Sequence, residues 1–262
     1  MFPVRTTPMN EQEKQWLTGF TEGDGSVGLY LQNQLTLRVS FSQKERDVLE
    51  YVQSLTQRGH FQQHHRGGFI TNHQSWTFSF YGKSCEPLLT TFSKYVVSKH
   101  FQERLNVTLI YLKLPPAVLH EPTLDWLIGF FDAEGSSSNK PSIDIGQKER
   151  DVLVAIKTKF GGNIRPHNNT HVWYLNGNKA RELAHAIVTK SHNPTKAERL
   201  LNYFNGPPYH VLHRERLATY RQKHLAETRE YNKKCWEEHK RINAYIKEHP
   251  EVVEKLQKQN NS

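Results

Sequence analysis

Cysteine and long apolar runs are scarce in this sequence. Cys85 and Cys235 are the only cysteines among 262 residues, too few and too far apart for a disulfide framework or a set of zinc ligands. No run of about 18 apolar residues occurs, so the sequence predicts no membrane-spanning helix. Residues 1–10 lack the apolar core of a signal peptide and carry a single arginine, a poor match to a transit peptide. These absences favour a reducing, intracellular setting over a membrane or secreted one.

Acidic residues are in the minority, and a glycine-rich phosphate loop is missing. The missing loop argues against an enzyme that acts on small phosphate substrates. Lys and Arg number 35 against 26 Asp and Glu, a formal net charge of +9. This excess favours a polyanionic partner, because each neutralised phosphate releases condensed counterions. Charge alone is equally compatible with a soluble, basic surface that binds nothing.

The chain repeats itself. Residues 43–49, Gln-Lys-Glu-Arg-Asp-Val-Leu, recur unchanged at 147–153. The other matching blocks, in the same order, are 16–20 with 126–130, 22–26 with 132–136, and 98–105 with 195–200. Blocks matching in one order indicate a tandem duplication. Two long repeats do not suit a solenoid, so two half-domains related by a pseudo-twofold axis are expected.

Proline marks the boundary between the repeats. Pro115, Pro116 and Pro122 bracket a short junction that cannot continue a helix. The sequence therefore predicts a first repeat at 1–115, a linker at 116–121, a second repeat at 122–205 and a helical extension at 206–262. The extension interleaves basic residues with Glu. It could contact nucleic acid, or it could be a surface helix that packs through side chains such as Trp236.

Hydrophobic periodicity predicts the α+β class. In the first repeat, a helix is expected over 11–22, a hairpin over 27–41 and a helix over 45–57. A second hairpin pairs residues 60–66 with the strand around 76–80, and helices fill 83–112. The order is helix, hairpin, helix, hairpin, helices, and the second repeat follows the same plan.

Both first helices end in Leu-x-Gly-Phe-x-acid-small-acid-Gly-Ser. Within this pattern Gly19 and Gly23 are four residues apart, as are Gly129 and Ala133, so each pair lies on one helix face. Small residues there allow two backbones to approach closely, which offsets the roughly 1 kcal/mol that Gly costs relative to Ala in a helix. We therefore expect the two helices to pack together along the pseudo-twofold axis.

Asp24 and Glu134 each precede the terminal Gly of this pattern, so helix packing would bring them together. Adjacent carboxylates repel each other and need cations, and oxygen-rich sites suit Mg²⁺. A role at a turn or helix end would be the better reading for either residue alone. Their matching context in both repeats favours a shared metal site instead. Glu22 and Asp132 lie roughly 200° round the helix and are expected to be structural.

The motif resembles the signature of the LAGLIDADG homing endonucleases, in two copies that span about residues 11–204. The resemblance implies a monomeric, site-specific endonuclease whose two antiparallel sheets form a saddle for double-stranded DNA. It places a divalent metal, Mg²⁺ or in a crystal Mn²⁺ or Ca²⁺, between Asp24 and Glu134, near the carbonyls of Gly23 and Ala133. The family also implies an organelle (mitochondrion or chloroplast) or the bacterial cytoplasm as its location.

Four further catalytic candidates follow from the resemblance. Gln43 and Gln147 stand where a strand meets the next helix, a place that lies near metal-bound water in the family. Lys99 and Lys196 match a basic position near the scissile phosphate, where a Lys could stabilise developing charge. Lys99 and Lys196 could instead be ordinary solvated lysines on helices, since most lysines are exposed. Lys94 and Lys190 are alternatives for the role near the phosphate.

The polar face of the first hairpin is expected to contact DNA. A two-stranded ribbon fits the major groove, where Gln can bond adenine and Arg guanine. A solvated sheet face is the ordinary alternative. The candidates in the first repeat are Ser26, Tyr30, Gln32, Gln34, Thr36, Arg38 and Ser40, and those in the second are Lys140, Ser142 and Asp144.

The second repeat has a shorter first hairpin. Gly25 and Gln43 are 18 positions apart, whereas Gly135 and Gln147 are 12 apart. Counting back from the shared Gln keeps the core register, so the loss falls on the hairpin tip. We expect fewer base contacts, and a more loosely read half-site, on that side. A maturase that binds intron RNA, or a regulator that binds DNA without cleaving it, is the alternative on the same fold.

Overall fold

The computed structural model describes residues 7–31, 34–66, 73–136 and 142–205, and in the C-terminal segment Glu230, Lys233, Trp236, Glu237, Lys240 and Arg241. The chain divides into two compact units, Met1–Gly206 and Pro207–Ser262. The first unit contains both sequence repeats. Nothing in its described part is a helix of the length and apolarity that crossing a membrane requires.

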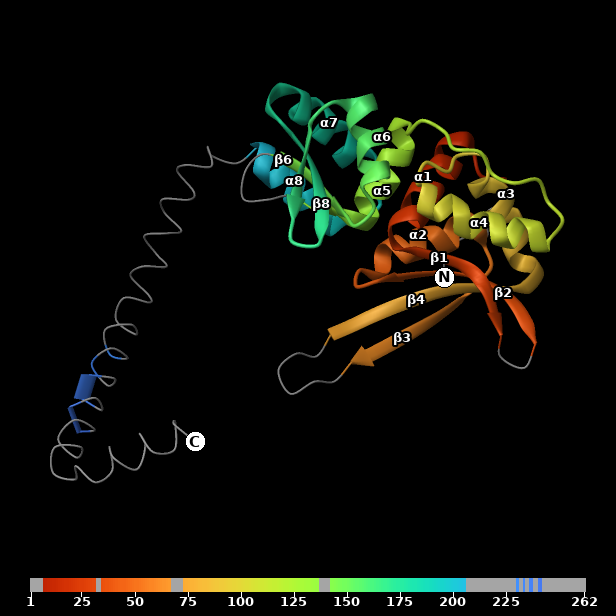
Figure 1. Ribbon diagram of the computed structural model, residues 1–262, viewed down its shortest axis with the longest axis horizontal. Helices are drawn as coiled ribbons and strands as arrows, with labels where there is room; N and C mark the ends of the chain where they lie inside the picture. The colour runs from red at the N-terminus through yellow and green to blue at the C-terminus, as the bar shows by residue number, and fades with distance from the viewer. Residues whose placement is uncertain are drawn as a thin grey trace, which may run out of the picture. The chain divides into compact units, whose positions relative to one another are not determined.

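The two repeats fold into the same series of elements (Figure 1). The first consists of α1 (Glu11–Asp24), β1 (Gly25–Leu31), β2 (Leu35–Gln43), α2 (Arg46–Thr56), β3 (His60–Arg66), β4 (His73–Tyr81), the 3-10 helix η1 (Gly82–Cys85), α3 (Glu86–Phe92) and α4 (Lys99–Tyr111). The second consists of α5 (Leu124–Glu134), β5 (Gly135–Ser136), β6 (Ser142–Gln147), α6 (Arg150–Phe160), β7 (Asn163–His167), β8 (Thr170–Asn176), α7 (Gly177–Lys190) and α8 (Pro194–Asn205). The predicted α+β class and repeated plan are confirmed.

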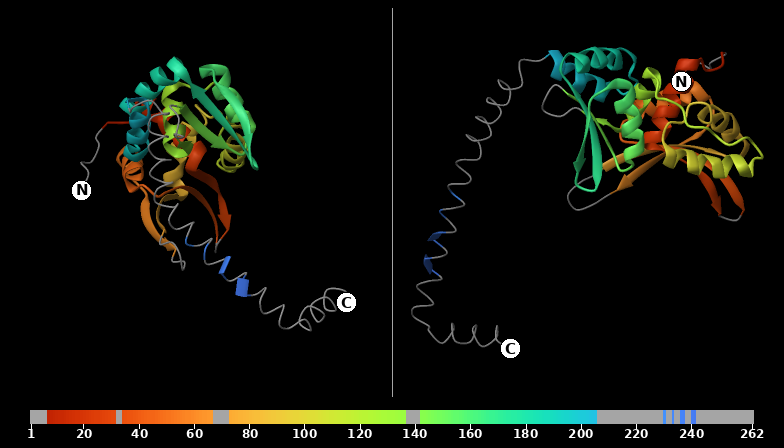
Figure 2. Two further views of the ribbon diagram at one scale, coloured as in Figure 1. Left: turned by 90° about the vertical axis from the view of Figure 1, so that its left-hand side faces the viewer. Right: turned by 45° about the horizontal axis from the view of Figure 1, so that its top comes forward.

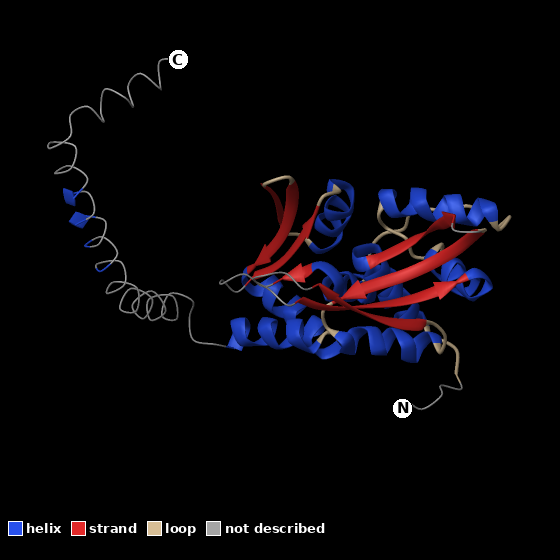
Figure 3. Cartoon of the chain, turned by 90° about the horizontal axis from the view of Figure 1, so that it is seen from below, coloured by secondary structure: helices blue, strands red, loops and turns tan. Residues whose placement is uncertain are grey.

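Each repeat forms one antiparallel four-stranded sheet, in the orders β1-β2-β4-β3 and β5-β6-β8-β7. Period-two alternation gives each sheet an apolar face, on which Val39, Phe41 and Ile145 are fully buried. Both sheets lie on the same side of the helices, as the right-hand view of Figure 2 and the view from below in Figure 3 show. The polar faces of the two sheets therefore belong to one side of the molecule.

Helices α1 and α5 pack directly against each other at the centre of the unit. A Cβ atom added to Gly19 would lie 2.0 Å from the carbonyl oxygen of Trp126, and one added to Gly129 would lie 1.9 Å from that of Trp16. These reciprocal contacts are the signature of a pseudo-twofold axis. The expectation that small residues let the two backbones touch is confirmed.

The strand register of the first hairpin is preserved between repeats. Gly25 pairs with Phe41, and Gly135 pairs with Ile145 at the equivalent place. β1 has seven residues and β5 only two, so the second hairpin is shorter, as the spacing predicted. The tips themselves lie outside the described residues.

The C-terminal unit is described at six positions, all helical and exposed. Trp236 is 58% exposed, and the ammonium of Lys240 lies 3.7 Å from the centre of its ring. A cation above an indole ring is attracted to the electron-rich face of that ring.

Candidate active site

Asp24 and Glu134 are the last residues of α1 and α5, and both are half-buried. The helix ends meet, since a Cβ atom added to Gly23 would lie 2.4 Å from Ala133 Cβ and 3.0 Å from Glu134 Cγ. Burial raises the pKa of both carboxyl groups, and the charge of Glu134 raises that of Asp24 further. The structure therefore brings these two acids together, as the helix pattern predicted.

Gln43 and Gln147 extend this arrangement symmetrically. The side-chain amide of Gln43, the last residue of β2, donates a hydrogen bond to Asp24 Oδ2. Gln147, the last residue of β6, makes the equivalent side-chain hydrogen bond to Glu134, which lowers the pKa of that carboxyl. Each Gln favours the ionised form of the carboxylate in its own half.

Lys196 is the cation beside the carboxylates. Its half-buried ammonium donates to the carbonyl oxygens of Ala133 and, at 3.4 Å, of Phe131. Burial lowers the pKa of Lys196, whereas Asp24 and Glu134 raise it. Its charge in turn lowers the pKa of both acids.

Lys99 does not occupy the equivalent place. It is the first residue of α4 and is exposed, and its backbone N–H donates to Asp151 Oδ2 over 2.9 Å. Lys196 is instead the third residue of α8. The sequence match between Lys99 and Lys196 is therefore wrong, because the two lysines stand two positions apart relative to the starts of their helices. The segments that precede the two helices differ in length. Lys94 is exposed, and Lys190 pairs with Asp125 at 2.8 Å.

A second pair of acids lies behind the helix ends. The Glu22 carboxylate accepts from Trp126 Nε1 of the other repeat at 2.8 Å, and from the backbone N–H groups of Val97 and Ser98. Burial raises the pKa of Glu22 to about 8, and these hydrogen bonds oppose the shift. Glu22 thus joins α1, α5 and the start of α4.

Asp132 repeats this arrangement in the other half. Its buried carboxylate accepts from Trp16 Nε1 at 2.9 Å, from the backbone N–H of His192 at 2.8 Å and from the Ser191 hydroxyl at 2.5 Å. Burial raises the pKa of Asp132 to about 6. The positions that we expected to be structural bind backbone and indole donors rather than the candidate metal site.

The predicted DNA-contacting residues of the first sheet share its polar face. Cross-strand partners are Ser26 with Ser40 and Tyr30 with Thr36. The guanidinium of Arg38 lies 5.6 Å from the ring centres of both Tyr30 and Tyr81, and Nη2 donates to Ser79 at 3.3 Å. Packing of this kind holds an arginine in one orientation. Gln34 is exposed, and Gln32 lies outside the described residues.

Three of the predicted contacts are buried. Ser40 is 8% exposed because it lies on a central strand, between its cross-strand partners Ser26 and Ser79. In the second sheet Ser142 and Asp144 are 4% and 5% exposed, and the Ser142 hydroxyl donates to the Asp144 carboxylate at 2.7 Å. The expectation that these three side chains face DNA directly is wrong. Lys140 lies outside the described residues.

The structure adds polar-face residues that sequence reasoning missed. His60, Gln62 and His64 of β3 lie on the same face as Arg38, since His60 pairs with Ser79 across the ladder. In the second sheet the side chain of Arg165 is 55% exposed and lies 5.2 Å from the Tyr174 ring and 3.6 Å from the Asp144 carboxylate. The alternation of polar residues along β3 and β7 was the available signal.

The oxygen donors at the helix ends fit a hard divalent cation. In the described ranges no group of three or more His, Cys, Asp or Glu side chains could hold a metal. Asp24 and Glu134 would therefore be its protein carboxylates, and water and phosphate oxygens would complete the shell. The Ala133 carbonyl is already bonded to Lys196, so this predicted ligand would have to share its oxygen.

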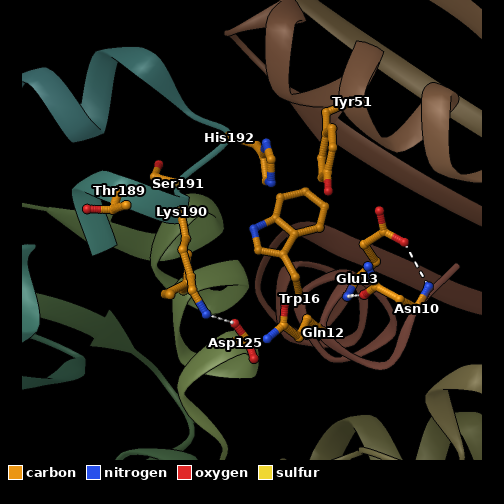
Figure 4. Close-up of a pocket in the computed structure, with 11 residues that line it drawn as sticks. Asn10, Gln12, Glu13, Trp16, Tyr51, Asp125, Thr189, Lys190, Ser191 and His192 are labelled. Atoms are coloured by element: carbon orange, nitrogen blue, oxygen red, sulfur yellow. Dashed lines mark hydrogen bonds and ion pairs between the residues drawn. The ribbon is translucent and has the colours of Figure 1, made fainter. Parts of the chain in front are cut away.

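A separate cavity of about 310 Å³ lies at the other end of α1, where Asn10 caps the helix (Figure 4). His192 stacks on Tyr51 with ring centres 3.3 Å apart. Both rings also make T-shaped contacts with the ring of Trp16, with centres 4.9 Å (Tyr51) and 5.2 Å (His192) away. Burial lowers the pKa of His192 to about 4. This aromatic group joins the two repeats at the end of α1 away from Asp24.

No family model matches the chain, and no curated protein matches its sequence. Among solved structures, the LAGLIDADG meganuclease I-AabMI bound to uncleaved DNA superposes with a TM-score of 0.55 at 17% identity, over 74% of this chain and 89% of that chain. The homing endonuclease I-WcaI bound to its DNA recognition sequence superposes with a TM-score of 0.49 at 15% identity, over 74% of this chain and 88% of that chain. The likeness to I-AabMI shows that the chain has the LAGLIDADG meganuclease fold.

Proposed function

We propose that this protein is a metal-dependent, site-specific endonuclease that hydrolyses phosphodiester bonds in double-stranded DNA as a single chain. One observation carries the proposal. Asp24 and Glu134, one from each repeat, meet at the end of a close-packed helix pair in a fold shared with a meganuclease bound to DNA. Burial disfavours the ionised form of both carboxyl groups, so a cation bound between them would stabilise the charged pair.

The residues around the acids support this chemistry. A divalent cation, which we expect to be Mg²⁺, would activate water and neutralise charge on the phosphate when it is held by Asp24 and Glu134. Gln43 and Gln147 fix the orientation of these carboxylates. Lys196 supplies a positive charge close to the reacting phosphate.

The polar sheet faces provide a surface for sequence recognition. Arg38, held against Tyr30 and Tyr81, is preorganised for bidentate contact with a guanine in the major groove. His60 and Gln62 offer further donors and acceptors along the same sheet. The net charge of +9 favours binding to the DNA backbone.

Cleavage of a plasmid library of randomised sites with Mg²⁺ tests the proposal. The parent protein should linearise a small set of plasmids, and Asp24→Asn and Glu134→Gln should each slow cleavage by roughly 100-fold or more, because each removes a charged ligand. Glu198→Gln, at an exposed position of α8, is the matched control and should cleave as the parent does. Equal cleavage by all four proteins would exclude this pair as the metal site.

One observation favours the alternative, a protein that binds DNA or intron RNA without cutting it. The ammonium of Lys196 already supplies positive charge to the carboxylate pair, so the pair can be stabilised inside the protein. The same selection, with bound plasmids recovered as well as cut ones, distinguishes the two functions. Specific retention of uncut DNA in Mg²⁺ and in Mn²⁺ would support the binding protein.

A further inference from the structure

We infer that an apolar groove between α7 and α8 is the docking site of residues 207–213 of the same chain. The inference concerns how the second repeat is completed, and it does not depend on the proposed endonuclease function. It rests on a further repeated block in the sequence and on the contacts that the first copy of this block makes.

The segment that follows α4 is repeated after α8. Residues 115–120 read Pro-Pro-Ala-Val-Leu-His, and residues 207–213 read Pro-Pro-Tyr-His-Val-Leu-His, the same block with Tyr in place of Ala and one His inserted. This block follows the other matching blocks in the same order, so the duplication extends past α8. Residues 207–213 lie outside the described residues, and the first copy indicates where the second belongs.

The first copy folds back along α4. The backbone N–H of Ala117 donates to Asn106 Oδ1 at 2.7 Å, and its carbonyl oxygen accepts from Gln102 Nε2 at 2.7 Å. Further along, the backbone N–H of His120 donates to the carbonyl oxygen of Val96, between α3 and α4, at 2.8 Å. Ala117 is 5% exposed. The segment after α4 thus covers one face of that helix.

Capping residues identify the matching face of α8. Ser98 and Asn193 precede α4 and α8, and each side chain accepts from the backbone N–H three residues later. Counting from these caps, Asn106 corresponds to Leu201. The polar side chain that holds Ala117 in the first repeat is therefore replaced by an apolar one in the second, and Leu201 is 41% exposed.

Leu201 belongs to a groove of about 600 Å³ between α7 and α8. A concave, mainly apolar surface of this size is typical of a place where another group binds. Five of the described residues that line it are apolar: Ala184 and Val188 of α7, and Leu200, Leu201 and Phe204 of α8.

Tyr209 suits this groove better than a second Ala would. A Tyr ring buries roughly 150–250 Å² and keeps a hydroxyl that needs a partner. The apolar wall around Leu201 can cover the ring, and Glu182 or His185, which also line the groove, can bond to the hydroxyl. The change from Ala117 to Tyr209 thus matches the change from Asn106 to Leu201.

The chain is long enough to reach the groove. α8 ends at Asn205, about one turn beyond Leu201. Tyr209 follows four residues later, and four extended residues span about 13 Å. Pro207 and Pro208 cannot continue a helix, so the chain can turn back at this point.

Crosslinking in the full chain tests the docking. Leu201→Cys and Tyr209→Cys are combined with Cys235→Ser, while the buried Cys85 is kept. A short bis-maleimide should join the two introduced thiols within one chain, as denaturing gels and peptide mass spectra report. Asn106→Cys with Ala117→Cys, in the first repeat, is the positive control, and Leu201→Cys with Tyr220→Cys should not crosslink. A bond between two chains, or none while the positive control reacts, would overturn the inference.

Thermal unfolding gives a second, independent measurement. Tyr209→Ala should lower the Tm by at least about 3 °C, because it removes a buried ring from the second repeat. Leu201→Asn puts the residue of the first repeat into the groove. Combined with Tyr209→Ala it should lower the Tm by less than the sum of the single effects, whereas combined with Tyr220→Ala the effects should add. An unchanged Tm for Tyr209→Ala, or additive effects for the first pair, would contradict the docking.

Discussion

Glycine at the helix crossing shows how one residue controls the distance between the two repeats. Replacing Gly129 with Ala would place a Cβ atom 1.9 Å from the backbone oxygen of Trp16, which cannot move without its helix. The helices would have to separate, and we predict a net loss of about 1–3 kcal/mol in the free energy of unfolding despite the better helix propensity of Ala. Urea denaturation of Gly129→Ala measures this loss.

Gly146 provides the matched control. It lies in β6, and a Cβ atom there would meet its nearest neighbour, Val172 Cγ2, at 4.0 Å. Gly146→Ala should therefore change the free energy of unfolding by less than about 1 kcal/mol. Equal losses for the two variants would mean that the helix crossing has room for a methyl group.

His192 gives the unfolding free energy a dependence on pH. Its pKa is lowered from 6.5 to about 4 by burial against Tyr51 and Trp16, so the folded protein holds it neutral. The unfolded chain takes up a proton below pH 6.5, and the stabilisation is therefore lost as the pH falls from 6.5 towards 4. His192→Phe keeps a ring and removes the titration. The parent should lose more stability than this variant between pH 7.5 and pH 5, and parallel curves would contradict the prediction.

Single residues were predictable where the duplication supplied a second copy. Asp24 and Glu134, or Gln43 and Gln147, stand in matching contexts, so the sequence identified them together. Lys196 has no such partner, and its place depends on how α8 is capped. Matching lysines by sequence ignores that three-dimensional constraint.

The acids Glu22 and Asp132 act at the scale of elements, because each joins both central helices to the segment before α4 or α8. Removing Glu22 would leave three donors without their acceptor, among them Trp126 Nε1. We predict that Glu22→Ala lowers the free energy of unfolding by about 3 kcal/mol, since each unpaired buried donor is costly. Thermal and urea unfolding measure the effect.

The comparison variants for Glu22 are Glu22→Gln and Glu103→Ala. Gln keeps one acceptor oxygen, so Glu22→Gln should lose less stability than Glu22→Ala. Glu103 is exposed on α4, and its replacement should change the free energy of unfolding by less than about 0.5 kcal/mol. If Glu22→Ala were as mild as Glu103→Ala, the connection between helices would not depend on this carboxylate.

Helices and strands were predictable from periodicity, but the exposure of each side chain on a sheet was not. Alternation correctly placed Ser40 and Asp144 on the polar faces. Whether a side chain on that face reaches solvent depends on its neighbours on adjacent strands, which only pairing reveals. Arg165, from a strand later in the chain, pairs with Asp144 in this way.

At the scale of the whole molecule, the two halves differ in the surface that they offer to DNA. The first half has a seven-residue β1 and presents Tyr30, Arg38 and Gln62 on its polar face. In the second half β5 has two residues, and Ser142 and Asp144 are buried. Among the described residues, fewer polar side chains are therefore free to bond to base edges in that half.

This difference predicts unequal stringency across the target site. Each mismatched base pair in a directly read half-site costs about 1–3 kcal/mol, because a bonded base edge is lost. We expect single-base variants on the side of the first sheet to fall in this range and most variants on the other side to cost less than about 1 kcal/mol. Competition binding at fixed salt, on every single-base variant of a selected site, measures both halves together. Arg38→Ala should relax preference at one position of the strict half and leave the loose half unchanged. Equal penalties in the two halves would show that the shorter hairpin reads DNA as closely as the longer one.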